Sequence, residues 1–346
     1  MSGFLTVGII QTALEVGLIY SLIALSLFIS FSILNICDLS TDGCYTLGSA
    51  VGAVVTISGH PILAIPASMA AGVCSGFVTA LLQTRFGVQS ILAGIIVNTG
   101  LYTVNLAVMG FSSNLSIFGT DTVFSLFKGL SENEFWQSWS KLILLACILT
   151  IVCIFIYRFL GTRIGLSIRA TGDSPAMVRA SSINPAFTIT VGLCLSNSLT
   201  GLAGSLIAQY NKTSDINLGT GMVTIALASL VIGETISGKG RMLRRIFCVV
   251  LGSCLYRFII SIALRLNVPT EAFKLVSALI VAIALIAPQA KQLISLQLRK
   301  RSQMRVPAGA GQGPSAIPSG REHRADRTKP ADFASEKGTD KKTDRR

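Results

Sequence analysis

Three long stretches of this chain carry no charged residue, and they constrain its fold more than any other feature. No Asp, Glu, Lys or Arg occurs between Asp42 and Arg85, between Arg85 and Asp121, or between Arg179 and Lys212. A helix that crosses a membrane needs about 20 mainly apolar residues, so each stretch can hold one or two such helices. Only 13% of the residues are charged, whereas soluble domains carry about 25%. These features exclude an ordinary cytosolic enzyme and predict an integral membrane protein.

The apolar runs predict an all-α, polytopic membrane helix bundle. About nine spans are expected, at residues 9–34, 43–59, 62–82, 88–109, 141–160, 186–208, 218–237, 246–266 and 272–288. Residues 1–288 would then form the membrane domain. The remaining segment, 289–346, is polar and rich in charge, Gly and Pro, a composition that predicts a disordered tail.

The positive charge of the chain indicates its orientation. The net charge is +13, and the tail holds 14 basic and 6 acidic residues. In the membrane domain, basic residues gather in the connections 83–87, 158–185 and 238–245, and short cytoplasmic loops retain Lys and Arg. These connections and the tail are predicted to be cytoplasmic, with the N-terminus outside. This distribution requires no nucleic-acid partner, and the basic start of the tail is expected to contact anionic membrane lipid.

A polar segment, residues 35–42, separates the first two predicted spans. It is either a cytoplasmic turn or the break in a discontinuous helix. A weak internal repeat bears on this choice, because Ser-Leu-Ile-Ala at 21–24 recurs at 205–208. An Asp and then a Gly follow each copy: Asp38 and Gly43, then Asp215 and Gly221. Corresponding broken helices in two halves of a transporter mark a binding site near the middle of the membrane, although four shared residues can also arise by chance.

Polar side chains inside the predicted spans are candidates for a solute path, because they are costly in lipid. Asn98, Tyr102 and Asn105 are spaced to lie on one helical face. Asp38 and Asn197 are the other two candidates. The alternative is that these side chains only join helices, through hydrogen bonds worth about 0.6 kcal/mol each.

Three charged residues also fall within or at the end of predicted spans: Glu15, Glu234 and Arg257. We expect Arg257 to pair with Glu15 or Glu234. A charge relay through Glu15 and Arg257 would make the chain an ion-coupled secondary transporter, which is the alternative function. No metal site is predicted, since the eight cysteines form no Cys-x-x-Cys and only two histidines occur. No catalytic residue is predicted either, because no acid–base pair can be identified.

The connection 161–185 is longer than a simple crossing requires. It has a basic start and then Gly-Asp-Ser-Pro at 172–175. Asp173 or Ser174 can cap a short helix, and Pro175 suits its first turn. About two helical turns are expected, ending near Ser182. We interpret this segment as a docking element on the cytoplasmic face, in preference to a plain basic loop.

Short motifs occur in a specific order between residues 10 and 288. They are Asp38-Leu39, Asp42-Gly43, Leu47-Gly48, the run Gly165 to Asp173, Leu195-Ser196-Asn197, Gly201 to Gly204, Ala208-Gln209-Tyr210, and Leu227 to Glu234. Together they resemble the permease subunits of bacterial ABC importers, of the branched-chain amino-acid and ribose type. The resemblance is greatest to a branch of uncharacterised ABC permeases, some of which are linked to aromatic amino-acid uptake. One departure is Ser182, where the family pattern has Gly.

This resemblance implies a function and a set of partners. The chain would be the permease subunit of an ATP-driven importer in the bacterial inner membrane, moving an amino acid or a sugar. Cytoplasmic ATPase subunits, an external solute-binding protein and a second permease copy would be its partners. The residues implied in coupling to the ATPase are Arg169, Ala170, Thr171, Gly172, Asp173, Ala180 and Ile183.

The resemblance also places ATP and Mg²⁺ on the partner ATPase, so no cofactor is expected on this chain. One motif could suggest otherwise, because Gly233 to Gly240 nearly spells a phosphate-binding P-loop. It lacks the Ser or Thr after Lys239 that would hold magnesium. It also ends an apolar span, where a P-loop would follow a strand. We therefore expect this chain to be a transport subunit without an ATPase site of its own.

Overall fold

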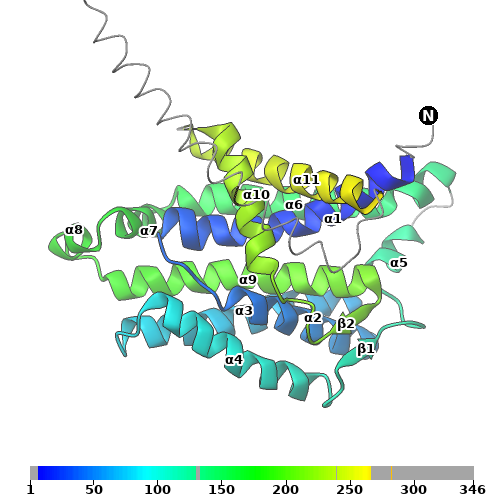
Figure 1. The fold of residues 1–346 in the computed structure, drawn as a ribbon, viewed down its shortest axis with the longest axis horizontal. Helices are drawn as coiled ribbons and strands as arrows, with labels where there is room; N and C mark the ends of the chain where they lie inside the picture. Colours follow the sequence, from blue (N-terminus) through cyan, green and yellow to red (C-terminus); the bar gives the residue numbers. More distant parts are fainter. Residues whose placement is uncertain (1–6, 130–132, 239, 266–281, 283–346) are drawn as a thin grey trace, which may run out of the picture. The chain divides into compact units, whose positions relative to one another are not determined.

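One helix, α9 (Pro185–Asn211), forms the centre of the bundle. Asn184 caps its start by accepting a hydrogen bond from the backbone N–H of Ala186 at 3.0 Å, and Pro185 occupies its first turn. Three helices surround it: α1 (Val7–Leu27), α2 (Thr41–Ile57) and α3 (Pro61–Thr84). Figure 1 shows α9 crossing the middle of the bundle. The computed structural model describes residues 7–129, 133–238, 240–265 and 282.

Small residues let the central helices approach closely. A Cβ atom added to Gly48 on α2 would lie 2.3 Å from the carbonyl oxygen of Gly201 on α9. One added to Gly72 on α3 would lie 2.2 Å from the carbonyl oxygen of Asn197. Burying apolar side chains does not drive helices together in a membrane, because lipid is as apolar as the side chains themselves. Close backbone contact, which small residues permit, stabilises the packing instead.

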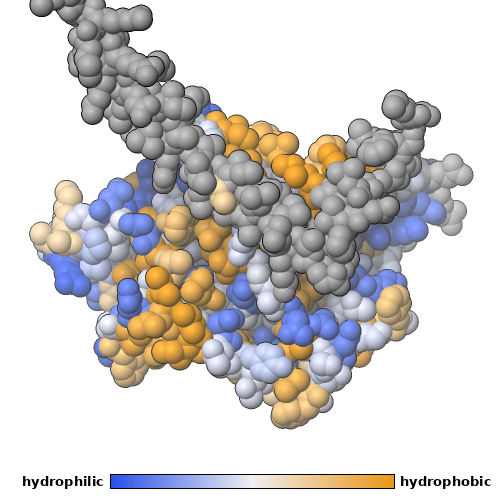
Figure 2. All heavy atoms as spheres, in the orientation of Figure 1, coloured by the Kyte–Doolittle hydropathy of each residue, from blue (hydrophilic) through white to orange (hydrophobic). Residues whose placement is uncertain are grey.

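The outer helices present apolar side chains to their surroundings. They are α4 (Ser90–Val108), α6 (Glu134–Leu160) and α11 (Met242–Arg265). Figure 2 shows hydrophobic surface over α4. Leu92 and Ile96 on α4 and Ile62 on α3 are all more than half exposed. Such a surface is what a lipid-facing helix requires.

The two ends of the bundle differ. At one end, here called the strand end, lie the short helix α5 (Val123–Lys128) and a two-stranded antiparallel sheet. The sheet pairs β1 (Asn114–Ser116) with β2 (Thr213–Asp215), so that Leu115 is opposite Ser214. At the other end, the α7 end, lie α7 (Arg163–Asp173) and α8 (Pro175–Ala180).

Six of the described helices are long and apolar enough to cross a membrane. They correspond to the predicted spans 9–34, 62–82, 88–109, 141–160, 186–208 and 246–266. Two further predicted spans are shorter helices: α2 has 17 residues and α10 (Met222–Ser237) has 16. At 1.5 Å per residue each is about 25 Å long, less than the ~30 Å of a bilayer core. The span 272–288 and the tail 289–346 lie outside the described residues, so the number of nine is not confirmed.

The first span ends in a break. Helix α1 continues as a π-helix, η1 (Phe28–Ile33), and the backbone then turns through Asn35, whose φ is +56°. Residues 34–40 are not helical, and they run back along α9 until Asp38 reaches Asn197, halfway along that helix. Helix α2 then runs beside α9 from Asn197 towards Ser205, opposite to the direction of α1. The break therefore reverses the chain inside the bundle, and segment 35–42 is neither a turn beyond the end of the bundle nor a break in a helix that continues in one direction.

Candidate functional site

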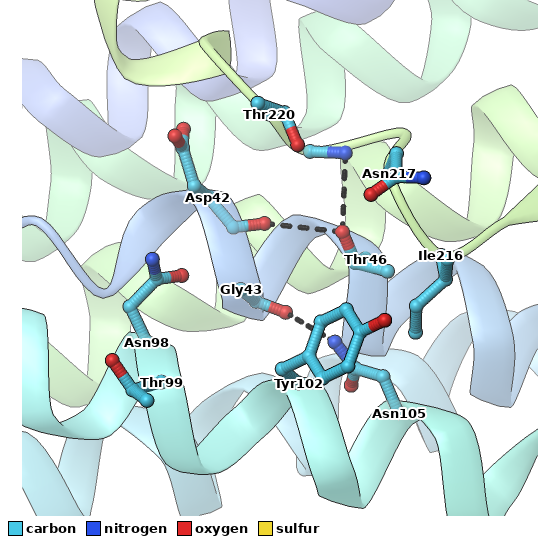
Figure 3. A pocket seen from close by; sticks show the side chains of 11 residues that line it. Asp42, Gly43, Thr46, Asn98, Thr99, Tyr102, Asn105, Ile216, Asn217 and Thr220 are labelled. Carbon is cyan, nitrogen blue, oxygen red and sulfur yellow. Dashed lines mark hydrogen bonds between the residues drawn. The ribbon is translucent and has the colours of Figure 1, made fainter.

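A polar cavity of about 320 Å³ lies where two short helices begin. Helix α2 starts there at Thr41, and α10 starts there at Met222 after a loop that returns from β2. The cavity is lined by Asp42, Gly43, Thr46, Asn98, Thr99, Tyr102, Asn105, Ile216, Asn217, Gly219 and Thr220. Figure 3 shows that these residues come from α2, from α4 and from the loop before α10.

Asp42 joins the starts of the two short helices. Its carboxylate accepts hydrogen bonds from the backbone N–H groups of Gly221 at 3.1 Å and Val223 at 2.8 Å. These N–H groups belong to the first turn of α10 and have no partner within the helix. A carboxylate at this position also suits the positive end of the helix dipole. Asp42 therefore acts as an N-cap supplied from another helix, and it fixes the wall of the cavity.

A second contact brings the loop before α10 against α2. The backbone N–H of Gly219 donates to the Thr46 hydroxyl at 3.1 Å, and that hydroxyl donates to the Asp42 carbonyl at 3.3 Å (Figure 3). Thr46 is 3% exposed, so this chain of hydrogen bonds is shielded from solvent. The loop is held by α2 on one side of the cavity, and α4 forms the opposite side.

The three polar residues predicted on one face of α4 all line this cavity. Asn105 is buried, and its side-chain N–H donates to the carbonyl of Gly43 at 3.1 Å. Tyr102 is 52% exposed, and its ring points from α4 into the cavity. Asn98 lies one turn before it, beside Gly43. The predicted common face is confirmed, and a role in solute passage remains a prediction.

The chemistry of the cavity is that of neutral hydrogen bonding. Among the described residues, the side chains of Asn98, Tyr102, Asn217 and Thr220 make no hydrogen bond to the protein. They leave amides and hydroxyls free to exchange hydrogen bonds with a solute. Asp42 is the only charged residue in the lining. The cavity thus suits a polar solute and offers no cationic side chain to an anion.

Asp38 and Asn197 do not line the cavity but brace the helix break behind it. The Asp38 carboxylate accepts from the backbone N–H of Ser40 at 2.8 Å, from the Ser40 hydroxyl at 2.6 Å and from the Asn197 amide at 2.9 Å. Both side chains are almost completely buried. A buried carboxylate needs such donors, and they hold residues 34–40 at the middle of α9.

The expected pairing of Arg257 with an acidic residue is wrong for the described part of the chain. Glu15 is occupied by Gln11 at 3.1 Å and by the Tyr210 hydroxyl at 2.9 Å. Glu234 forms a salt bridge with Arg245 at 2.7 Å, near the α7 end. The guanidinium of Arg257 lies over the ring of Tyr20, 5.4 Å from its centroid.

The reason for this difference is positional. Glu234 lies near the end of α10, and Arg245 lies near the start of α11, so the turn between these helices brings the two side chains together. Arg257 lies further along α11. Ser32, at the end of η1, also donates to Glu234. These three residues tie the end of the first span to α10 and α11.

The residues implied in coupling separate into an exposed and an inward-facing group. Arg169, Ala170, Asp173 and Ala180 are exposed, and Ile183 is partly exposed. Thr171 is 2% exposed, and its hydroxyl lies 2.8 Å from that of Thr188 on α9. Gly172 packs on the end of η1, where an added Cβ would lie 1.9 Å from the Ile33 carbonyl oxygen. Thr171 thus joins α7 to α9, and Gly172 joins α7 to η1, which leads into the break.

The predicted short helix with its cap is present as α8. The Ser174 hydroxyl accepts from the backbone N–H of Met177 at 3.4 Å, and Pro175 is in the first turn. Asp173 instead ends α7. Ser182 follows α8 with φ +59°, the left-handed conformation that favours Gly. The glycine of the family pattern is therefore explained by backbone geometry.

Replacing Ser182 with Gly is expected to stabilise this turn. A side chain in the left-handed region costs about 1 kcal/mol, part of which is offset by the greater freedom of Gly in the unfolded chain. The expected gain is under about 1 kcal/mol, detectable as a higher midpoint in thermal unfolding of the detergent-purified protein. Ser181→Gly is the matched control and should lower the midpoint, since Ser181 has a negative φ of −88°. A lower midpoint for Ser182→Gly would contradict the explanation.

The sequence did not indicate that residues 216–220 take part in the site. They carry ordinary polar side chains in a short loop, and their partners lie far away in the sequence. The internal repeat was the only available signal, because it aligned the Asp–Gly segments that precede α2 and α10. Asp42 belongs to one of the short motifs, but its role as a cap depends on contacts between helices.

Comparisons with known proteins agree with one another. The family model described as "Branched-chain amino acid transport system / permease component" matches residues 9–285. A tyrosine transport system permease protein of Clostridioides difficile (strain R20291) is 32% identical over 301 residues, which cover 87% of this chain and 96% of that protein. A ribose import permease protein of Escherichia coli (strain K12) is 27% identical over 267 residues, 74% of this chain and 78% of that protein. No solved structure matches the chain significantly.

Proposed function

Because the chain belongs to the family of permease components of branched-chain amino acid transport systems, we propose that it forms the membrane path of an ATP-driven importer. The importer would operate in the bacterial inner membrane and take up a small polar solute, an amino acid or a sugar. The observation that carries this proposal is the polar cavity at the meeting point of α2 and α10, linked through the first span to an exposed docking segment.

The cavity supports the choice of solute class. Its free amides and hydroxyls can bind the hydroxyls of a sugar or the polar groups of an amino acid, and Tyr102 can pack against an apolar or flat part of either. One relative is a permease for tyrosine and another for ribose. A solute of either kind fits a site without cationic side chains better than a phosphate or a dicarboxylate does.

The α7 end supports docking to a cytoplasmic ATPase, which would bind ATP and Mg²⁺ and supply the energy. Met177 on α8 is 71% exposed, and Asp173 and Ala180 are exposed near it. A movement of α7 would displace the end of η1, where the helix break begins, because Gly172 packs on the Ile33 carbonyl. From there the non-helical segment leads to Asp38 and then to Asp42 at the cavity.

Orientation and the remaining partners complete the proposal. The basic α7 end would face the cytoplasm, with the strand end and the N-terminus outside. An external binding protein would deliver the solute to the strand end. A second permease copy would complete the path. The alternative of an ion-coupled transporter has less support, because Glu15 and Arg257 make no ion pair within the described residues.

The proposal predicts that an ATPase subunit co-purifies with this chain in mild detergent. Asp173→Arg should reduce the recovered ATPase by about tenfold or more, since a reversed charge in an interface costs several kcal/mol. The control is Asp121→Arg, an exposed position near the strand end, which should leave recovery unchanged. Import at full rate by the purified chain without any ATPase would refute the proposal.

A further inference from the structure

A second cavity, of about 460 Å³, lies at the α7 end, apart from the polar cavity described above. It forms where α6 ends, α7 begins and α11 starts. Its lining consists of Tyr157, Arg158, Leu160, Gly161, Thr162, Arg169 and Met242. No acidic residue is among them, and the proposed function assigns this cavity no role.

Both arginines of this cavity are available to a ligand. Within the described residues, no carboxylate lies within 4.0 Å of Arg158 or Arg169, and neither guanidinium donates a hydrogen bond to the protein. Two guanidinium groups in one cavity present several N–H donors in the planar arrangement that matches phosphate oxygens. The cavity therefore has the chemistry of a phosphate site.

The position of Arg158 indicates where the phosphate comes from. Ile151, Ile154 and Phe155 are 62%, 57% and 51% exposed. Arg158 follows them by seven, four and three residues, which are helical spacings, so it ends the same face of α6. That face is apolar along a candidate membrane span, Trp136–Leu160, in which an apolar stretch of 18 residues is only 22% buried. A ligand that fills the cavity is thus in contact with a surface suited to acyl chains.

We propose that this cavity binds the phosphate of an anionic phospholipid. The phosphate lies between Arg158 and Arg169, and the acyl chains follow the face formed by Ile151, Ile154 and Phe155. Basic pockets between membrane helices near the cytoplasmic surface bind anionic headgroups in this way. An acidic segment of a protein partner could meet the arginines but would leave the apolar face uncovered.

Such a lipid would connect α6 to α7. Arg158 is in the last turn of α6, whereas Arg169 is on α7, and the two helices are joined by Gly161 and Thr162. Binding one headgroup to both helices would fix the angle of α7 relative to the membrane. Arg169, which the family resemblance places in the coupling segment, would then act on the lipid side of α7 and not on the ATPase.

The test is native mass spectrometry of the full-length protein titrated with phosphatidylglycerol in detergent. The double variant Arg158→Gln/Arg169→Gln should weaken phosphatidylglycerol binding by about tenfold or more, and each single variant by an intermediate factor. Phosphatidylcholine should bind the variants and the original protein equally. The matched control is Arg163→Gln/Arg179→Gln, which removes two exposed arginines from the same end without touching the cavity. It should change binding by less than about twofold.

Three results would overturn the proposal. An equal loss in the control pair would mean that the basic surface as a whole attracts the lipid. Displacement of phosphatidylglycerol by inorganic phosphate at equal concentration would assign the cavity to a soluble anion. Unchanged lipid binding by the double variant, together with loss of a co-purifying ATPase, would assign the arginines to a protein partner.

Discussion

Replacing Asp42 with Ala is expected to reduce solute uptake by about tenfold or more, the largest effect of any single change at the cavity. Two backbone N–H groups at the start of α10 would lose their acceptor inside the bundle. Each hydrogen bond to a charged acceptor is worth about 1.5–3 kcal/mol, and a tenfold change in uptake needs only about 1.4 kcal/mol. The measurement is uptake by proteoliposomes that contain the permease and its ATPase.

Two further variants separate the capping role from loss of charge. Asp42→Asn keeps one acceptor oxygen and should show an intermediate loss. Asp121→Ala is the control, because that carboxylate also accepts a hydrogen bond at the start of a helix, from the Ser125 hydroxyl at 3.2 Å, but it is exposed and does not line the cavity. It should retain nearly full uptake. If Asp42→Asn and Asp42→Ala were equally active and both near the original level, the joining of α2 to α10 would have no functional importance.

Replacing Gly172 with Ala is expected to uncouple ATP hydrolysis from uptake. The new methyl group would meet the Ile33 carbonyl oxygen at 1.9 Å, so α7 must move away from η1. Overpacking of this kind costs about 1–3 kcal/mol. We expect the ATPase still to bind and hydrolyse ATP, because the exposed residues of α7 and α8 are unchanged, while uptake falls by at least about fivefold. The ratio of solute imported to ATP hydrolysed is the quantity to measure.

Gly161→Ala provides the matched control for this variant. Gly161 lies in the same connection and has a negative φ, and an added Cβ would make only an ordinary contact at 3.4 Å with the Arg158 carbonyl oxygen. Its uptake-to-ATP ratio should equal that of the original protein. Uptake by Gly172→Ala at the original ratio would show that α7 does not act through η1.

Local sequence patterns were sufficient for much of this fold. Hydropathy located eight apolar runs that the structure describes as helices, because the free energy of burying a helix in lipid depends mainly on its own side chains. The spacing of Asn98, Tyr102 and Asn105 placed them on one face for a similarly local reason. Local propensity also identified Ser174 and Pro175 at the start of α8. The predicted span 141–160 begins too late, because α6 begins at Glu134 and includes Trp136.

The partners of these elements could not be obtained in the same way. Asp42 and Val223 are separated by 181 positions, and nothing in either segment specifies the other. The prediction that Arg257 pairs with Glu15 or Glu234 was wrong, because the sequence places these residues in helices but does not fix which turn of one helix faces which turn of another. Asp38 and Asn197 were chosen for polarity alone, and their hydrogen bond places them behind the cavity.

The sequence by itself determined that this protein is a helical membrane protein with a basic, capped segment on one side. Those properties follow from hydropathy, charge and capping, which act over one or two helical turns. Only the tertiary structure decided that the starts of α2 and α10 meet, that the 216–220 loop closes a polar cavity, and that Gly172 rests on the end of the broken helix. These contacts depend on close backbone approach between helices, which many small residues permit but which only the packing of the complete bundle selects.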